Sequence, residues 1–233
     1  MARTSDRAVL SPNEAAEGRL VAGPVRPVGS APVGLQRLGL STGRDGLLYV
    51  PQSYSAESPS PLALMLHGAG GDARGALQPF LTRADQFGMV LLAPDSRQST
   101  WDVLRGGFGP DVTFINRALD ETFTQYAIDP HHVLIEGFSD GASYALSLGL
   151  TNGDFFGGIA AFSPGFMAPS QARGKPRVFI SHGTGDRTLA IETTSREIVP
   201  QLRRAGYDVR YVEFQGPHTV PPAIALQALE WLL

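Results

Sequence analysis

A serine between two glycines stands where an apolar run gives way to a segment of helical character. Residues 137–141 read G-F-S-D-G and follow the apolar residues 133–135. The pattern G-x-S-x-G is typical of a sharp strand-to-helix turn that exposes a nucleophilic serine, and the glycines are needed because the turn leaves little room for side chains. Residues 39–43 match the same pattern, but they lead into the apolar run 47–50 rather than into a helix, so we interpret them as a turn between strands. The context therefore predicts Ser139 as a nucleophile.

An aspartate and a histidine follow two later apolar runs of strand length. Asp186 comes after the run 178–180 in a glycine-rich turn, and His218 comes after the run 209–214. The order serine, aspartate, histidine is the one expected of a triad in one particular fold with a mostly parallel sheet, and in such sheets functional residues follow the strands directly. We predict Ser139 as the nucleophile, His218 as the general base and then acid, and Asp186 as the acid that orients the imidazole.

A second glycine-rich segment, residues 67–71 with the sequence H-G-A-G-G, follows the apolar run 62–66. Glycines allow the backbone N–H groups to point at a developing negative charge, so we expect the N–H groups of Ala69 and Asp140 to form an oxyanion hole. The side chain of Asp140 is then expected to point away from that site, and His67 to make structural hydrogen bonds. A phosphate-binding loop is the alternative, but no G-K-[ST] sequence follows the glycines.

Taken together, these motifs resemble those of the α/β-hydrolases, and specifically of the small phospholipase/carboxylesterase group. They are also similar to those of polyhydroxybutyrate-depolymerase and feruloyl-esterase relatives. Six segments spread over roughly residues 35–233 carry the resemblance: L-L-Y-V-P at 47–51, L-H-G-A-G-G at 66–71, I-D-P at 128–130, G-F-S-D-G at 137–141, H-G-T-G-D at 182–186 and P-H at 217–218. The resemblance implies hydrolysis of carboxylic esters through an acyl-enzyme. Asp140 stands where acyl-protein thioesterases commonly have glutamine, which weakens that particular assignment.

Apolar runs of strand length alternate with segments of helical length from about residue 35 onward. The expected strands lie at 35–40, 47–50, 62–66, 89–93, 133–135, 159–162, 178–180 and 209–214, and the expected helices at 74–87, 110–127, 140–152, 192–205 and 221–233. This alternation predicts an α/β fold with a mostly parallel central sheet, helices on both faces and an antiparallel first pair of strands. Residues 1–34 are expected to form an extended N-terminal arm, and residues 35–233 a single α/β-hydrolase domain.

The expected substrates are esters with short to medium acyl chains. Only residues 164–176 follow the sixth strand as material for a lid, so no sizeable lid is expected and the site is open. Trp101, Phe108 and Phe166 are candidates to line an acyl pocket, although each is equally compatible with an ordinary core position. The same triad also fits a thioesterase or lysophospholipase, a dienelactone-type hydrolase, an acyltransferase or a peptidase. A non-catalytic binding module is disfavoured because no triad member is missing.

Composition narrows the remaining possibilities. The chain of 233 residues is 42% hydrophobic and 18% charged, which excludes a disordered chain, and it has no cysteine for disulfides, thiolate metal sites or catalysis. Its net charge of −3 and its scattered basic residues do not favour nucleic-acid binding. Its five histidines lack zinc-site spacing, so neither a metal nor a cofactor is expected.

No apolar run reaches the length of a membrane span, and the N-terminus has no apolar signal segment. We therefore expect a cytoplasmic monomer or homodimer whose partner is a small-molecule ester; a secreted polyester depolymerase is disfavoured.

Overall fold

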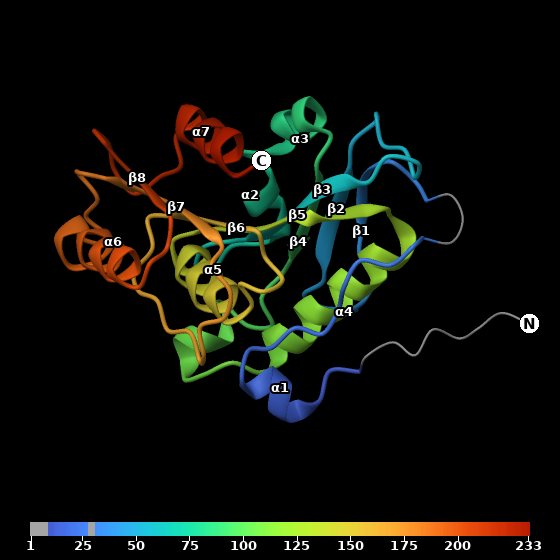
Figure 1. The fold of residues 1–233 in the computed structure, drawn as a ribbon, viewed down its shortest axis with the longest axis horizontal. Coiled ribbons are helices and arrows are strands. Elements are labelled where there is room, and N and C mark those ends of the chain that lie inside the picture. Colours follow the sequence, from blue (N-terminus) through green and yellow to red (C-terminus); the bar gives the residue numbers. More distant parts are fainter. Residues whose placement is uncertain (1–8, 28–30) are drawn as a thin grey trace, which may run out of the picture.

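A single mixed sheet organises the part of the chain that the computed structural model describes, residues 9–27 and 31–233 (Figure 1). Its eight strands are β1 (Gly34–Arg37), β2 (Gly46–Val50), β3 (Ser60–Leu66), β4 (Val90–Pro94), β5 (Ile128–Phe138), β6 (Gly158–Phe162), β7 (Arg177–Gly183) and β8 (Val209–Phe214). They lie in the order β1-β2-β4-β3-β5-β6-β7-β8. The pairs β1–β2 and β2–β4 are antiparallel and all the others are parallel, which confirms the predicted sheet and its antiparallel first strands.

Helices cover both faces of this sheet, as the wholly apolar strands predicted. One face packs against α4 (Pro110–Gln125), α5 (Asp140–Thr151) and α6 (Ser195–Arg204), and the other against α2 (Ala73–Leu77), α3 (Leu81–Phe87) and α7 (Pro222–Leu232) (Figure 1). Short 3-10 helices occupy Asp102–Arg105 and Ile191–Thr193. Within the described residues, none of the helices has the length and apolar character of a transmembrane span.

The helix expected at 74–87 is two helices. α2 ends at Leu77 and α3 begins at Leu81, so the helical backbone is interrupted around Pro79. Proline has no N–H to donate to the preceding turn, and its ring crowds that turn, so Pro79 disfavours continuation of α2. The single-helix prediction was wrong because the apolar spacing persists across the break while the backbone bonding does not.

The N-terminal segment contains structure that its composition did not suggest. A short helix, α1 (Pro12–Ala16), begins with a capping box in which Ser11 and Glu14 each bond the other's backbone N–H. After it the chain is extended, and Leu20 and Ala22 are buried in the core on the α4 and α5 side of the sheet. Residues 1–8 and 28–30 of the predicted arm lie outside the described residues.

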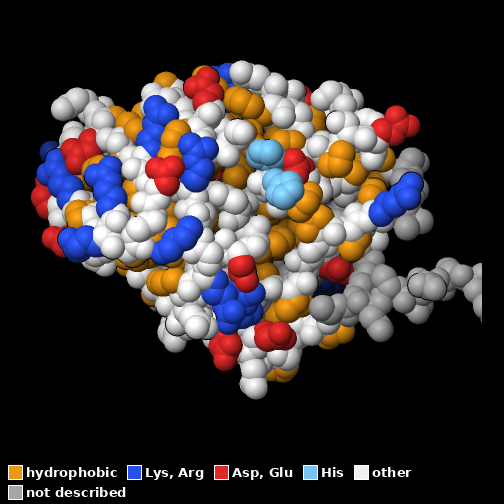
Figure 2. Space-filling view, in the orientation of Figure 1, with side chains coloured by type: hydrophobic (Ala, Val, Ile, Leu, Met, Phe, Trp, Pro, Cys, Tyr) orange, Lys and Arg blue, Asp and Glu red, His pale blue; other side chains and the backbone are white. Residues whose placement is uncertain are grey.

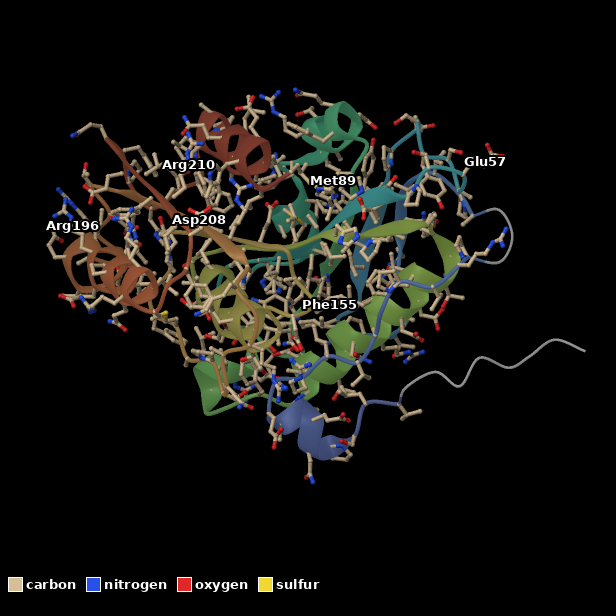
Figure 3. The ribbon with its side chains drawn as sticks, viewed as in Figure 1. Glu57, Met89, Phe155, Arg196, Asp208 and Arg210 are labelled. Carbon is tan, nitrogen blue, oxygen red and sulfur yellow. The ribbon has the colours of Figure 1, made fainter. Side chains whose placement is uncertain are left out.

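The strand β8 forms one edge of the sheet, and charged side chains surround it. Lys and Arg side chains gather over α6 and β8 (Figure 2), and Arg196 and Arg210 lie in this region (Figure 3). Arg196 of α6 forms an ion pair with Glu213 of β8 at 2.8 Å. Charges along an edge strand disfavour pairing with a strand of another molecule.

The turn from β5 into α5 is packed against the end of β3 so closely that two positions admit only glycine. A Cβ atom on Gly137 would lie 2.1 Å from the carbonyl oxygen of Gly141, and a Cβ on Gly141 would lie 2.2 Å from that of Leu66. Both distances are far inside van der Waals contact, and both neighbours are backbone atoms with no freedom to move aside. The two glycines that the motif requires are therefore explained by packing.

We expect Gly141→Ala to lower the melting temperature by roughly 5–10 °C, since an overpacked core site costs about 1–3 kcal/mol in general and a backbone clash lies at the upper end. Gly43→Ala is the matched control, because Gly43 ends the other G-x-S-x-G segment and a Cβ there meets nothing within 4 Å. Thermal unfolding of the two variants by circular dichroism checks this. Equal melting temperatures would contradict the packing argument.

Candidate active site

Ser139 occupies the turn between β5 and α5 in a strained backbone conformation. Its φ of 57° and ψ of −119° are unfavourable for a residue with a side chain and persist only when the surroundings enforce them. The Ser139 N–H donates to the carbonyl of Phe162 at the end of β6, at 2.9 Å. Its own carbonyl accepts from the N–H groups of Ala142 and Ser143 in the first turn of α5. The serine is thus fixed between a strand end and a helix start.

The three predicted triad residues meet at the carboxyl ends of the parallel strands. His218 Nε2 lies 2.8 Å from Ser139 Oγ, and His218 Nδ1 lies 2.5 Å from Asp186 Oδ2. The Nδ1–H group donates to the carboxylate, which leaves Nε2 free to accept the hydroxyl proton of the serine. This is a continuous path for a proton from a nucleophile to a base that an acid orients.

Asp186 is held as a carboxylate by hydrogen bonds. Burial alone would raise its pKa, but backbone N–H donation from Leu189, the bond from His218 and backbone N–H donation from Thr188 outweigh burial, and the pKa is lowered. The two backbone bonds reach Oδ1 at 2.9 Å and 2.8 Å. The residue therefore carries a negative charge where an imidazolium would form.

His182, which we did not predict as a functional residue, also contacts this carboxylate. Its side chain is fully buried, and Nε2 lies 3.2 Å from Asp186 Oδ2 and 2.9 Å from the carbonyl oxygen of Leu189. Because Nε2 faces a carbonyl and a carboxylate oxygen, which only accept, it is the protonated nitrogen, and Nδ1 accepts from the Ser195 hydroxyl at 2.7 Å. Burial lowers the pKa of His182, which is neutral in this arrangement. The signal in the sequence is its place at the start of the H-G-T-G-D segment, four residues before Asp186.

The segment 67–71 lies beside the serine, as an oxyanion hole requires. A Cβ on Gly68 would lie 3.4 Å from the Cβ of Ser139, so Gly68 lies directly beside the serine side chain. Asp140 is the first residue of α5, and the first N–H groups of a helix have no acceptor within it. Its side chain accepts a hydrogen bond from Thr100 Oγ1 at 2.6 Å.

His67 fixes the start of this segment through its ring. Nδ1–H donates to the carbonyl of Gly68 at 2.7 Å, and Nε2 accepts from the N–H of Ser96 at 3.0 Å. Burial lowers the pKa of His67, which agrees with a neutral ring bonded in this way. Trp101 Nε1–H donates to the carbonyl of His67 at 2.8 Å. These hydrogen bonds of His67 and Trp101 position the loop, and neither side chain is bonded to the serine.

A cavity of about 400 Å³ opens beside the triad. Its wall includes Gly68 and Ala69 from the predicted oxyanion loop and His218 from the triad. Most of the remaining lining is apolar, from Met65, Leu66, Ala76, Pro79, Phe80, Phe138, Phe162 and Val220. The volume and character are typical of a small-molecule site.

The three aromatic residues predicted for an acyl pocket lie outside this lining. Trp101 has no exposed surface and stacks on Tyr144 with ring centroids 5.0 Å apart, so it belongs to the core. Phe108 is half-buried with its ring 5.8 Å from that of Tyr144, and Phe166 is half-buried in the segment after β6. Residue type and loop position suggested these three, but packing between α5 and the loops decides where their rings go.

Comparison with known proteins identifies the fold. No family model matches the chain. Among solved structures, the esterase PE8 superposes with a TM-score of 0.67 at 24% identity, over 86% of this chain and 100% of that one. A phospholipase/carboxylesterase from Dyadobacter fermentans gives a TM-score of 0.61 at 20% identity, over 88% and 98%. The chain has the α/β-hydrolase fold. The resemblance inferred from the motifs is thereby confirmed.

Curated relatives of this chain are named as esterases and a depolymerase. It is 32% identical over 117 residues to the putative esterase NocK of Nocardia uniformis subsp. tsuyamanensis, covering 47% of this chain and 34% of that protein. It is 34% identical over 136 residues to a poly(3-hydroxybutyrate) depolymerase of Ralstonia pickettii, covering 49% and 28%. Feruloyl esterase C of Emericella nidulans is 25% identical over 199 residues, covering 80% and 72%. The matched part thus spans about a third of the first two relatives.

We expect His182→Leu to lower the kcat for ester hydrolysis roughly tenfold with little change in KM, because a hydrogen bond to a charged group is worth about 1.5–3 kcal/mol in general. His182→Gln should recover part of the loss, since its amide can still donate. His132→Leu is the control, because this half-exposed histidine is bonded to Asp129 at the opposite end of β5. Steady-state kinetics of the three variants test the contact, and an unchanged kcat in a folded His182→Leu protein would refute it.

Proposed function

We propose that this protein is a serine hydrolase that cleaves carboxylic esters of short to medium acyl chains through an acyl-enzyme. The observation that carries the proposal is the unbroken hydrogen-bond chain from Ser139 through His218 to Asp186. The esterase names of the relatives support the same class of reaction. The names of the relatives describe the activities of those proteins, and for this chain ester hydrolysis is a proposal.

In the first half-reaction the hydroxyl of Ser139 attacks the ester carbonyl while His218 Nε2 accepts its proton. Asp186 stabilises the imidazolium that forms. The N–H groups of Ala69 and Asp140 bind the oxyanion of the tetrahedral intermediate, a contribution of about 3 kcal/mol per donor in comparable sites. His218 then gives the proton to the leaving alcohol, and the acyl group stays on the serine.

In the second half-reaction water replaces the alcohol. His218 removes a proton from the water as its oxygen attacks the acyl carbonyl, and the oxyanion is held by the same two N–H groups. Collapse of this intermediate releases the acid and returns the proton to Ser139. The same imidazole therefore acts as base and acid in turn.

The segments that border the site limit the size of the acyl group. Residues 163–176, between β6 and β7, contain no helix or strand that could cover a long chain. The cavity of about 400 Å³ accepts a group of moderate size. Thioesterase, lysophospholipase, dienelactone-hydrolase and peptidase activities use the same triad and stay alternatives. The cytoplasmic location and the monomeric or homodimeric state also stay predictions.

We expect Ser139→Ala to lose at least about 10⁴-fold in kcat on p-nitrophenyl esters, in line with the loss of a nucleophile in other triads. Ser41→Ala, in the other G-x-S-x-G segment, should keep full activity. A serine-directed fluorophosphonate should label wild type once and leave Ser139→Ala unlabelled, as measured by mass spectrometry.

The rate of hydrolysis should fall as the acyl chain of the p-nitrophenyl ester becomes longer. A preference for long-chain triglycerides would refute the open site.

The rate should fall as the pH is lowered, because His218 must be neutral to accept the proton of the serine. Asp186 has a lowered pKa and keeps its charge over the same range, so it adds no second acid step there. The profile of kcat/KM on p-nitrophenyl acetate between pH 5 and 9 measures this. A flat profile would argue against an imidazole base.

A further inference from the structure

The mostly apolar wall of the cavity beside the triad includes one carboxylic acid, Glu136. Glu136 lies on β5 three residues before the nucleophile, and its side chain has no exposed surface. It faces the same side of the sheet as Leu134 and Phe138, because side chains alternate along a strand. That side packs against α2, α3 and α7, and the cavity opens there between apolar walls.

Neither carboxyl oxygen of Glu136 has a hydrogen-bond partner among the described residues. A buried polar group left without a partner costs about 1–3 kcal/mol, and more when it is charged. The other titratable side chains of the cavity wall are His67 and His218, and both are bonded elsewhere. Glu136 is therefore the one titratable side chain of this cavity wall that has no hydrogen-bond partner among the described residues.

The protonation state of Glu136 limits which ligand group fits. Burial raises its pKa to about 8, so the group is a neutral carboxylic acid near pH 7. A neutral acid has one O–H donor and one carbonyl acceptor. A hydroxyl group complements it in both directions, whereas a methyl group leaves both atoms unpaired and an ammonium group requires the ionised form.

We propose that the cavity binds an apolar arm of the ester that ends in a hydroxyl group, and that Glu136 hydrogen-bonds this hydroxyl. The inference rests on the proposed esterase function, since it names the substrate class of that site. Three residues along a strand span about 10 Å, so the hydroxyl lies at the far end of the arm rather than next to the ester. The arm is either the acyl chain or the alcohol, and both present the same chemistry to Glu136.

Matched ester pairs test the proposal. The acyl pairs are p-nitrophenyl ω-hydroxyalkanoates and alkanoates in which a methyl group replaces the hydroxyl, with four to ten carbons. The alcohol pairs are acetates of α,ω-diols and of the corresponding alkanols. In wild type the hydroxyl member of one series should have a kcat/KM roughly tenfold to a hundredfold higher at its best chain length, because the methyl member leaves the acid unpaired.

Substitution of Glu136 should change this ratio. Glu136→Leu should bring it to one or below, and Glu136→Gln should keep part of it because an amide also donates and accepts. Ser181→Ala is the matched control, since Ser181 on β7 is equally buried and unpartnered but does not line the cavity. A ratio near one at every length in wild type, a ratio unchanged in folded Glu136→Leu, or a preference for ω-amino esters would each overturn the proposal.

Two measurements separate this proposal from the esterase proposal. Calorimetry of Ser139→Ala with intact methyl ω-hydroxyalkanoates and their alkanoate counterparts reports affinity without turnover, so the preference is decided even if no ester is hydrolysed. The difference in melting temperature between unliganded wild type and Glu136→Gln should shift against wild type as the pH rises from about 5 to 8, because folded wild type keeps a proton on Glu136 that the unfolded state, with a pKa near 4.5, has released. Burial also lowers the pKa values of His67 and His182, but these residues are present in both proteins and cancel in the difference. A difference that stays constant with pH would place the ionised carboxylate in the folded state and overturn the hydroxyl assignment.

Discussion

The site depends on one close approach between backbones, that of the β5–α5 turn to the end of β3. Gly141 lies against the carbonyl of Leu66, and Gly137 lies against Gly141, at distances that no side chain tolerates. In the same turn Ser139 has a positive φ, and Gly68 lies next to the serine. The predicted nucleophile and the predicted oxyanion donors therefore lie at the same packing contact, which would preorganise them for the charge that the proposed reaction develops.

Two buried carboxyl groups near this turn show how hydrogen bonds set charge. Asp186 receives two backbone N–H bonds and two imidazole contacts, and its pKa is lowered in spite of burial. Glu136 receives none among the described residues, and burial raises its pKa to about 8. The first is suited to stabilising an imidazolium and the second to donating a hydrogen bond. Asp186 and Glu136 are both carboxylic acids, and it is their different surroundings that give them different charge states.

The fold and the chemistry are supported by different observations. Structural neighbours at 24% identity or less establish the arrangement of the sheet and its helices. A fold of this kind hosts many reactions, so the proposed ester hydrolysis is argued from the distances among Ser139, His218 and Asp186. The substrate class is argued one step further, from the lining of the adjacent cavity.

The sequence by itself determined the alternation of strands and helices from about residue 35 onward, apart from the split of the helix expected at 74–87, and the identity of the three residues that meet. Ser139, Asp186 and His218 could be found because each directly follows an apolar strand, and parallel strands deliver such residues to one edge of a sheet. Local signals were also present for the break at Pro79 and for the capping box of Ser11 and Glu14, although apolar spacing alone overlooked both. Only the tertiary structure decided the burial of Trp101, the contact of His182 with Asp186 and the unpaired state of Glu136. Each of these depends on atoms brought together from distant segments, and burial and hydrogen bonding with such partners leave no local pattern in the chain.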